Sequence, residues 1–482
     1  MKRFLLYLIL CIFSINYANG QVTPGSIVEE NIGVFLSTPA TNYVKEMPVV
    51  IIRYIPTLDG INLDVAQATD YWDLGNITIN DLKSNIDIYN ARTKFSLEEG
   101  SKFRGYKNVN AVPYLGYKVL KYITVYRQIN VSNHLLGTEG GKNIYQPDYK
   151  KEFDVLNLTN FIKTNNVKEV WIWYGEPARP GWPSYNESIH GNIQKHVSFV
   201  ESNMASPTTG DISNSYRVAD DLYILDHTYV VYCYNFRRSQ AEAVHNHGHQ
   251  LEAMYNYTAE RQDGNISMFV QNFSGWGDNN YQIPPIGRAG DCHHPPNTTK
   301  DYDYQNTDLV NSDIEDWKPL GGTKKLVNCN TWGSLVYDWP GAADFNQKTE
   351  SQWYIYWMQN MPGFNNNIPF NSYKMTNWWQ FTSDWDSCYN NNIGLYGLAT
   401  GLQDNSNEII NVYPNPVFDR IRINVNSFPV YAYFYSLENK LIDIKLLNNN
   451  VNEINVENLS NGIYILRLLS DREIIVKKFI KQ

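Results

Sequence analysis

The sequence predicts a central α/β domain with a mainly parallel sheet and long loops, followed by a small all-β domain. Three observations support this fold class. The chain has 482 residues, a length that predicts roughly two or three domains, each with its own core. Runs of β-branched and aromatic residues alternate with helical periods in the first half. Short strands separated by turns fill the C-terminal end.

The central domain is predicted over residues 23–400. Its apolar runs are typical of strands, and some are apolar almost throughout, as in sheets covered on both faces; they are residues 48–56, 117–127, 167–174 and 222–236. Between them, residues 78–95 place Leu82, Ile86 and Tyr89 at helical spacing, and residues 149–166 do so less regularly. Strands that alternate with helices indicate a mainly parallel sheet. Turn-rich stretches after Asn272 predict long, functional or cross-linked loops.

The N-terminus has the pattern of a secretory signal peptide. Lys2 and Arg3 precede an apolar run over residues 4–15, and Ala18-Asn19-Gly20 supplies small residues for cleavage. We predict that residues 1–20 are the signal peptide. No later apolar segment is long enough for a membrane span, so the mature chain is not expected to cross a membrane. A net charge of -9 offers no field for a phosphate backbone, which argues against nucleic acid as a partner.

The C-terminal residues form a separate predicted domain. Small and polar residues at 397–408 are typical of a linker, and residues 409–482 then contain short alternating strands with turns between them. The alternation from Arg420 to Val425 is that of a half-buried strand. Strands at this spacing predict an antiparallel β-sandwich.

Three motifs in this domain carry a family resemblance. They are NVYPNP from Asn411, NLSNGIYILRL from Asn458 and the terminal VKKFIKQ. In this order they resemble the type A C-terminal sorting domain of the type IX secretion system of Bacteroidetes. The resemblance implies that the chain reaches the periplasm, meets the type IX machinery through this domain and becomes secreted or cell-surface bound. In that family the domain is usually removed during export.

Export places the remaining cysteines in an oxidising compartment, where disulfides form. They are Cys233, Cys292, Cys329 and Cys388. Sequence alone cannot choose among the pairings. We predict a disulfide between Cys292 and Cys329, because both lie in turn-rich stretches. Cys233 lies in an apolar run and is equally compatible with a buried free thiol.

The segment EAVHNHGHQLE, residues 242–252, contains the candidate metal ligands. Ser239 and Glu242 have the spacing of a capping box, which predicts a helix start. On that helix His245, His249 and Glu252 share one face, and the two imidazoles lie about 6 Å apart along the axis, within reach of one zinc ion. The chain departs from the H-E-x-x-H motif because Asn246 replaces the general base.

Further residues would have to complete such a site. We predict His294, from the loop DCHHPPN, as the third ligand beside His245 and His249, which leaves zinc an open position for water. Glu252 is a candidate catalytic residue, third ligand or orienting carboxylate. The acidic stretch from Asp301 lacks the glycine and the terminal glutamate of a calcium loop. The same polar residues are also compatible with a metal-free site or a purely structural helix face.

A second chemistry needs no metal. Glu176 follows the apolar run that ends at Tyr174, and carboxylates at the carboxyl ends of parallel strands face the ligand crevice. With Asp226 or Glu252 as a second carboxylate, Glu176 could act on a glycosidic bond. The predicted function is therefore a secreted, metal-assisted hydrolase of an extracellular polymer. A metal-free glycoside hydrolase and a non-catalytic glycan-binding protein are the alternatives.

Overall fold

The fold comes from a computed structural model, which describes most of the chain. The described residues are 21–39, 42–68, 77–108, 110–175, 186–190, 195–197, 201–215, 218, 220–277, 287–333, 348–398, 412–424, 430–436, 441–469 and 474–482. They form two compact units. The first contains the described residues up to Asn366 together with Thr376–Leu395, and the second contains Asn367–Met375 and Tyr396–Gln482.

A six-stranded mixed sheet forms the centre of the first unit. In spatial order its strands are β1 (Ile27–Glu29), β3 (Leu115–Val125), β2 (Lys45–Tyr54), β6 (Glu169–Tyr174), β9 (Tyr229–Asn235) and β8 (Ser202–Ala205). The four inner strands are parallel to one another, whereas the edge strands β1 and β8 pair antiparallel to their neighbours. The predicted α/β sheet is confirmed at this coarse level, although it is mixed and its antiparallel edges were not predicted.

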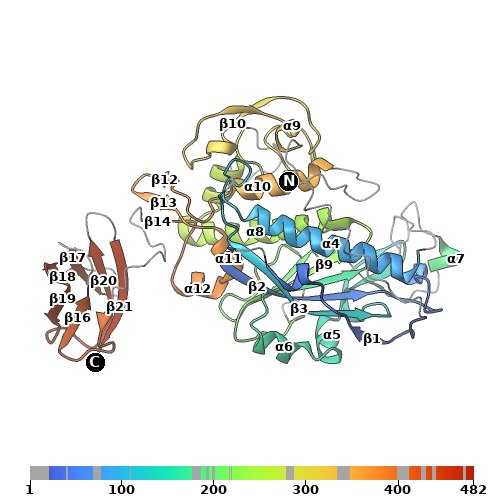
Figure 1. Ribbon diagram of the computed structural model, residues 1–482, viewed down its shortest axis with the longest axis horizontal. Coiled ribbons are helices and arrows are strands. Elements are labelled where there is room, and N and C mark those ends of the chain that lie inside the picture. The colour runs from blue at the N-terminus through green and yellow to red at the C-terminus, as the bar shows by residue number, and fades with distance from the viewer. Residues whose placement is uncertain are drawn as a thin grey trace. The chain divides into compact units, whose positions relative to one another are not determined.

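Helices cover both faces of this sheet (Figure 1). The helices α4 (Ile79–Gly100) and α8 (Ser239–Asp263) lie on one face, and α5 (Tyr149–Val155) and α6 (Leu158–Thr164) lie on the other. The side chains of α5 and α6 share a buried apolar cluster with the strands beneath them. Asn157, with a φ of 50°, separates α5 from α6, which explains why the helical spacing of residues 149–166 is irregular.

Shorter elements complete the first unit. They are α2 (Val34–Ser37), α3 (Val65–Ala68), β4 (Val131–Glu139), β5 (Lys142–Pro147), α7 (Glu187–His190), β7 (His196–Val197), η1 (Ser267–Ser274), β10 (Val310–Ser312), η2 (Ile314–Asp316), β11 (Lys325–Val327), α9 (Cys329–Gly333), α10 (Lys348–Asn360), α11 (Trp379–Ser383) and α12 (Trp385–Asn390). The aromatic face of α10 is fully buried through Trp353, Tyr356 and Trp357. Apolar burial of rings this large is a major source of stability.

The second unit is all β. Its strands are β12 (Pro369–Phe370), β13 (Tyr373–Met375), β14 (Tyr396–Leu398), β15 (Val412–Tyr413), β16 (Arg420–Asn424), β17 (Val430–Ser436), β18 (Leu441–Leu447), β19 (Val451–Asn455), β20 (Gly462–Leu469) and β21 (Ile474–Lys481). From β15 onward they form two antiparallel sheets, β15-β16-β19 and β18-β17-β20-β21. One apolar cluster joins these two sheets, as in a β-sandwich. The strands predicted from alternation are present, and their ends lie within one or two residues of the predicted ends.

The predicted signal peptide, residues 1–20, lies outside the described residues, as does most of the predicted linker. The predicted domain boundaries stay predictions.

Candidate metal centre

The helix α8 presents the histidine segment. It begins at Ser239, but its N-cap residue is Arg238 and no side chain caps it. The predicted capping box is wrong, because Glu242 turns instead to Arg238, at 3.1 Å, and to Nδ1 of His245, at 3.7 Å. The helix therefore starts where predicted, while its first acidic residue serves the histidine one turn further along.

Three imidazoles converge on one point beside α8. The Nε2 atom of His293 lies 2.7 Å from Nε2 of His245 and 2.9 Å from Nε2 of His249. The first two rings come from successive turns of α8, as their spacing predicts. The third comes from the loop after η1. The ligand atoms of a four-coordinate zinc lie roughly 3.3 Å from one another. A small movement of the three rings away from one another would therefore make room for an ion.

A carboxylate stands behind each ring. Nδ1 of His249 lies 2.9 Å from Glu252, and Nδ1 of His293 lies 2.9 Å from Asp301. Nδ1 of His245 faces Glu242, as described above. Metal-bound histidines nearly always donate their second ring nitrogen to such a carboxylate, which fixes the tautomer and leaves the lone pair on the metal side.

Hydrogen bonds alone cannot satisfy the three facing nitrogens. Nε2 of His293 carries either one proton or one lone pair. With its proton on Nδ1, toward Asp301, it offers one lone pair to both His245 and His249. At most one of the two short contacts can then be a conventional hydrogen bond, whereas a cation between the rings would satisfy all three lone pairs.

The charges around the rings reflect the same crowding. Burial opposes ionisation of Glu242, but its interactions with His245 and Arg238 lower its pKa to about 2. Burial lowers the pKa of His249, yet the Glu252 carboxylate more than offsets it and raises the pKa to about 9. Burial, together with the neighbouring imidazoles, lowers the pKa of His293 to about 2. His293 is therefore neutral, the form in which an imidazole binds a metal, whereas His249 would have to release a proton when a metal binds.

The loop of residues 290–294 owes its conformation to neighbours far along the chain. Asp291 Oδ1 accepts the backbone N–H groups of His293 and His294, and its Oδ2 accepts Nε1–H of Trp276 at 2.6 Å. From α10, the indole N–H of Trp353 reaches the carbonyls of Asp291 and Cys292, and that of Trp357 reaches Gly290. These contacts decide which side chain faces α8.

His293, not the predicted His294, therefore brings its ring to His245 and His249. His294 turns the other way: its Nδ1 lies 2.9 Å from Asp291 and its Nε2 lies 3.3 Å from Asp301. Asp301, considered in the sequence only as part of a weak calcium loop, thus contacts both histidines. The sequence could not distinguish these two adjacent histidines, because they lie in a loop that has no helical or strand periodicity to show which side chain faces α8.

Cys292 packs against the helix. Its backbone N–H donates to Glu252 at 2.8 Å. If Gly248 carried a Cβ atom, that atom would lie only 2.6 Å from Sγ of Cys292. The thiol also shares a set with His245 and His249 in which the candidate ligand atoms lie within 4.8 Å of one another. Cys292 and Cys329 form no disulfide, so the predicted disulfide is wrong: the Cys292 thiol is directed into the helix contact.

The other predicted residues lie elsewhere. Asp226 precedes β9 and is exposed, paired with His227 and Lys163. Glu176 lies outside the described residues. Asn246 donates to the carbonyl of Cys233 at 2.6 Å and so faces the sheet. Glu252 does reach the centre, but both its oxygens are occupied, by His249 and by the Cys292 backbone, which fits the orienting alternative.

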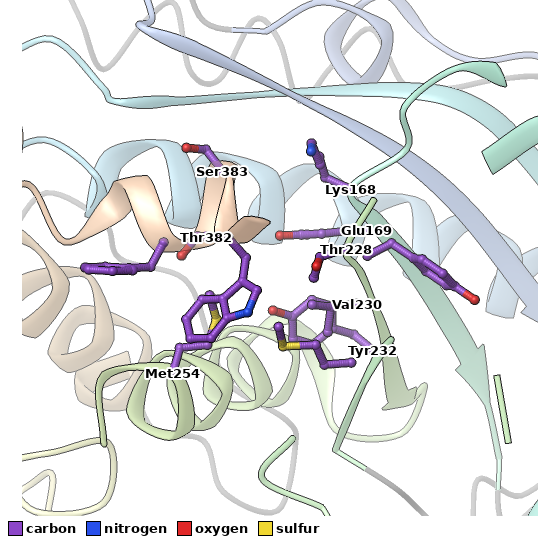
Figure 2. Close-up of a pocket in the computed structure, with 12 residues that line it drawn as sticks. Lys168, Glu169, Thr228, Val230, Tyr232, Met254, Thr382 and Ser383 are labelled. Carbon is purple, nitrogen blue, oxygen red and sulfur yellow. The ribbon is translucent and has the colours of Figure 1, made fainter. Parts of the chain in front are cut away.

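A narrow pocket lies at the amino ends of β6 and β9 (Figure 2), and none of its lining residues is a histidine. Glu169, Thr228, Tyr232, Met254 and Thr382 are among its lining residues. Its space is of the order of one water molecule, so an organic substrate does not fit. Burial raises the pKa of Glu169 to about 8, against hydrogen bonds from Trp171 and Tyr117 that lower it.

Comparisons with known proteins identify the C-terminal end. Residues 411–482 match the family described as "Secretion system C-terminal sorting domain". This segment is a type IX sorting domain. It implies export to the cell surface or secretion and an interaction with the type IX machinery. Among the described residues, none of the helices combines the length and apolar character needed to cross a bilayer.

The central domain has no recognised family. No curated protein matches the sequence. Among solved structures, the chain is similar to PorZ of Porphyromonas gingivalis, described as "an essential bacterial surface component of the type-IX secretion system", at 16% identity and a TM-score of 0.14. The match covers 18% of this chain and 14% of that one.

Proposed function

We propose that this chain is a type IX cargo whose central domain binds a transition metal at His245, His249 and His293 and uses it to hydrolyse an extracellular polymer. The convergence of three Nε2 atoms, each ring backed by a carboxylate, carries the proposal. Three imidazole donors favour zinc and its neighbours over magnesium or calcium. The sorting domain supports action outside the cell.

A metal held by three imidazoles supplies Lewis acidity and lowers the pKa of a bound water. The chain's own residues prepare the site for it. Glu252 and Asp301 keep the ring protons of His249 and His293 on the Nδ1 side, and Glu242 faces Nδ1 of His245 at 3.7 Å. On the open side, Tyr302 lies beside His293, with ring centroids 4.2 Å apart, and is 47% exposed. The His293 side chain is itself 21% exposed, so the site reaches solvent at this edge.

The alternatives receive less support. Trp171 and Trp173, near the predicted glycosidase residue, are fully buried, so they pack in the core and offer no stacking surface for a sugar. Glu176, on which the metal-free glycosidase depends, lies outside the described residues.

Zinc binding to the purified mature protein tests the proposal. We expect one equivalent of zinc in the wild type, loss of that zinc in His293→Ala, and retention in His294→Ala, the matched neighbour. A protein that binds no transition metal, or that loses zinc equally in both variants, contradicts the proposed ligand set. Zinc-loaded and metal-free protein are then compared on esters, peptides and polysaccharides. Equal turnover on every substrate would refute the hydrolase.

A further inference from the structure

We propose that Glu201 is the fourth ligand of the metal centre, which makes the resting site a closed set of three imidazoles and one carboxylate. This inference rests on the proposed function, because it presupposes a metal at the three histidines. Nothing in the amino-acid sequence singles out Glu201 as a candidate ligand. Glu201 is isolated from the histidine segments along the chain and belongs to no motif.

The edge strand β8 brings Glu201 to α8. Glu201 directly precedes β8, which pairs antiparallel with β9. Ser202 Oγ donates to Gln250 Oε1 at 2.6 Å, and Gln250 is the residue after His249 on α8. Gln250 also donates to the carbonyl of Ile212 at 3.1 Å. The segment carrying Glu201 is therefore fixed next to the ring of His249 by contacts with the helix itself.

Glu201 differs from the other carboxylates in the side of the ring that it faces. Glu252 contacts Nδ1 of His249, behind the ring. Glu201 Oε2 instead lies 3.8 Å from Nε2 of His249, the atom that points to His293. Ligand atoms around a four-coordinate zinc lie roughly 3.3 Å apart. A movement of about half an ångström would therefore place Glu201 at a ligand distance.

A neighbouring amide holds this carboxylate in position. Asn214 Nδ2 donates to Glu201 Oε2 at 2.7 Å. Metal-bound carboxylates are usually held by such hydrogen bonds. The Glu201 side chain is 29% exposed, so it lies at the boundary between the buried rings and solvent. A substrate or water would have to displace this carboxylate to reach the metal.

Cys292 is the competing fourth donor. Its thiol belongs to the set with His245 and His249, but it also packs on the backbone of α8, 3.6 Å from the carbonyl of His245. A thiolate there would give a site of three nitrogens and one sulfur, which is chemically distinct from three nitrogens and one oxygen. Spectroscopy separates the two.

The test uses purified mature protein loaded with Zn²⁺ or Co²⁺. Zinc affinity is measured by competition with a chelator for the wild type, Glu201→Ala, Glu201→Gln and Asn214→Ala. Glu260→Gln, an exposed glutamate on α8, is the matched control. Thermal unfolding of each apo variant checks that the fold is kept. X-ray absorption of the zinc form and the visible spectrum of the cobalt form identify the donor atoms.

We expect Glu201→Ala to weaken zinc binding at least about tenfold, Asn214→Ala to weaken it less, and Glu260→Gln to leave it within about twofold. The zinc shell should contain nitrogen and oxygen only, and the cobalt form should show no thiolate band. A thiolate band, or a Glu201→Ala affinity equal to that of Glu260→Gln, overturns the inference while leaving the three-histidine site intact. Absence of zinc from the wild type overturns both.

Discussion

Gly248 lies between His245 and His249 of α8, the proposed metal ligands, and its replacement by alanine gives a sharp test of the packing there. A Cβ at this position would stand 2.6 Å from the Cys292 thiol and 3.5 Å from the Trp357 ring. The second contact is ordinary, but the first requires the thiol to retreat by about 1 Å. Because Cys292 precedes His293, that retreat would move the third imidazole away from the other two.

Two opposing effects set the magnitude. Alanine in a helix interior is favoured over glycine by about 1 kcal/mol, whereas overpacking a core contact costs typically 1–3 kcal/mol. We therefore expect Gly248→Ala to destabilise the apoprotein by about 1 kcal/mol. Zinc affinity should fall at least about tenfold, since metal–ligand distances tolerate only about 0.2 Å of error.

Cys292→Ala removes the atom with which the new Cβ collides. In that background the same glycine substitution should stabilise the protein by about 1 kcal/mol, because only the helix preference remains. Urea unfolding followed by tryptophan fluorescence measures both steps of the double-mutant cycle. If Gly248→Ala stabilises equally in both backgrounds and leaves zinc affinity unchanged, the loop does not pack on α8 as described.

Three further outcomes follow from the same structure. Burial raises the pKa of Glu169 in the folded state to about 8, against 4.5 for an ordinary glutamate. Between these two pH values the folded protein keeps a proton on Glu169 that the unfolded chain has lost. The free energy of unfolding therefore falls as the pH rises through this range. Glu169→Gln should remove up to about 1.4 kcal/mol per pH unit of that slope, and identical unfolding free energies against pH for wild type and variant would contradict the shift. Glu252→Gln should weaken zinc binding by about 10-fold or more, measured by chelator competition, whereas an unchanged affinity would mean that the His249 ring needs no carboxylate behind it. Removal of residues 411–482 should abolish export, which cell fractionation checks by the amount of protein in the medium and on the surface; undiminished export would show that the matched domain is not the signal.

Local patterns predicted which side chains of α8 lie on one face. Side chains four residues apart meet on one helix face whatever the rest of the chain does, so His245, His249 and Glu252 could be grouped from spacing alone. The choice between His293 and His294 depended on Asp291 and on indoles from α10, which are distant in sequence. The position of the Cys292 thiol against Gly248 has the same origin, because it exists only when the loop is packed on α8.

The sequence by itself determined the sorting domain, the strand alternation of its sandwich, the inner strands of the central sheet and the shared face of the helical histidines. Each of these depends on neighbours within a few residues or on a contiguous motif, and so the local periodicity of the backbone suffices. Only the tertiary structure decided the antiparallel edges of the sheet, the third imidazole and the position of Glu201. These depend on pairing between β8 and β9 and on burial of the α10 indoles, interactions whose partners are far apart along the chain.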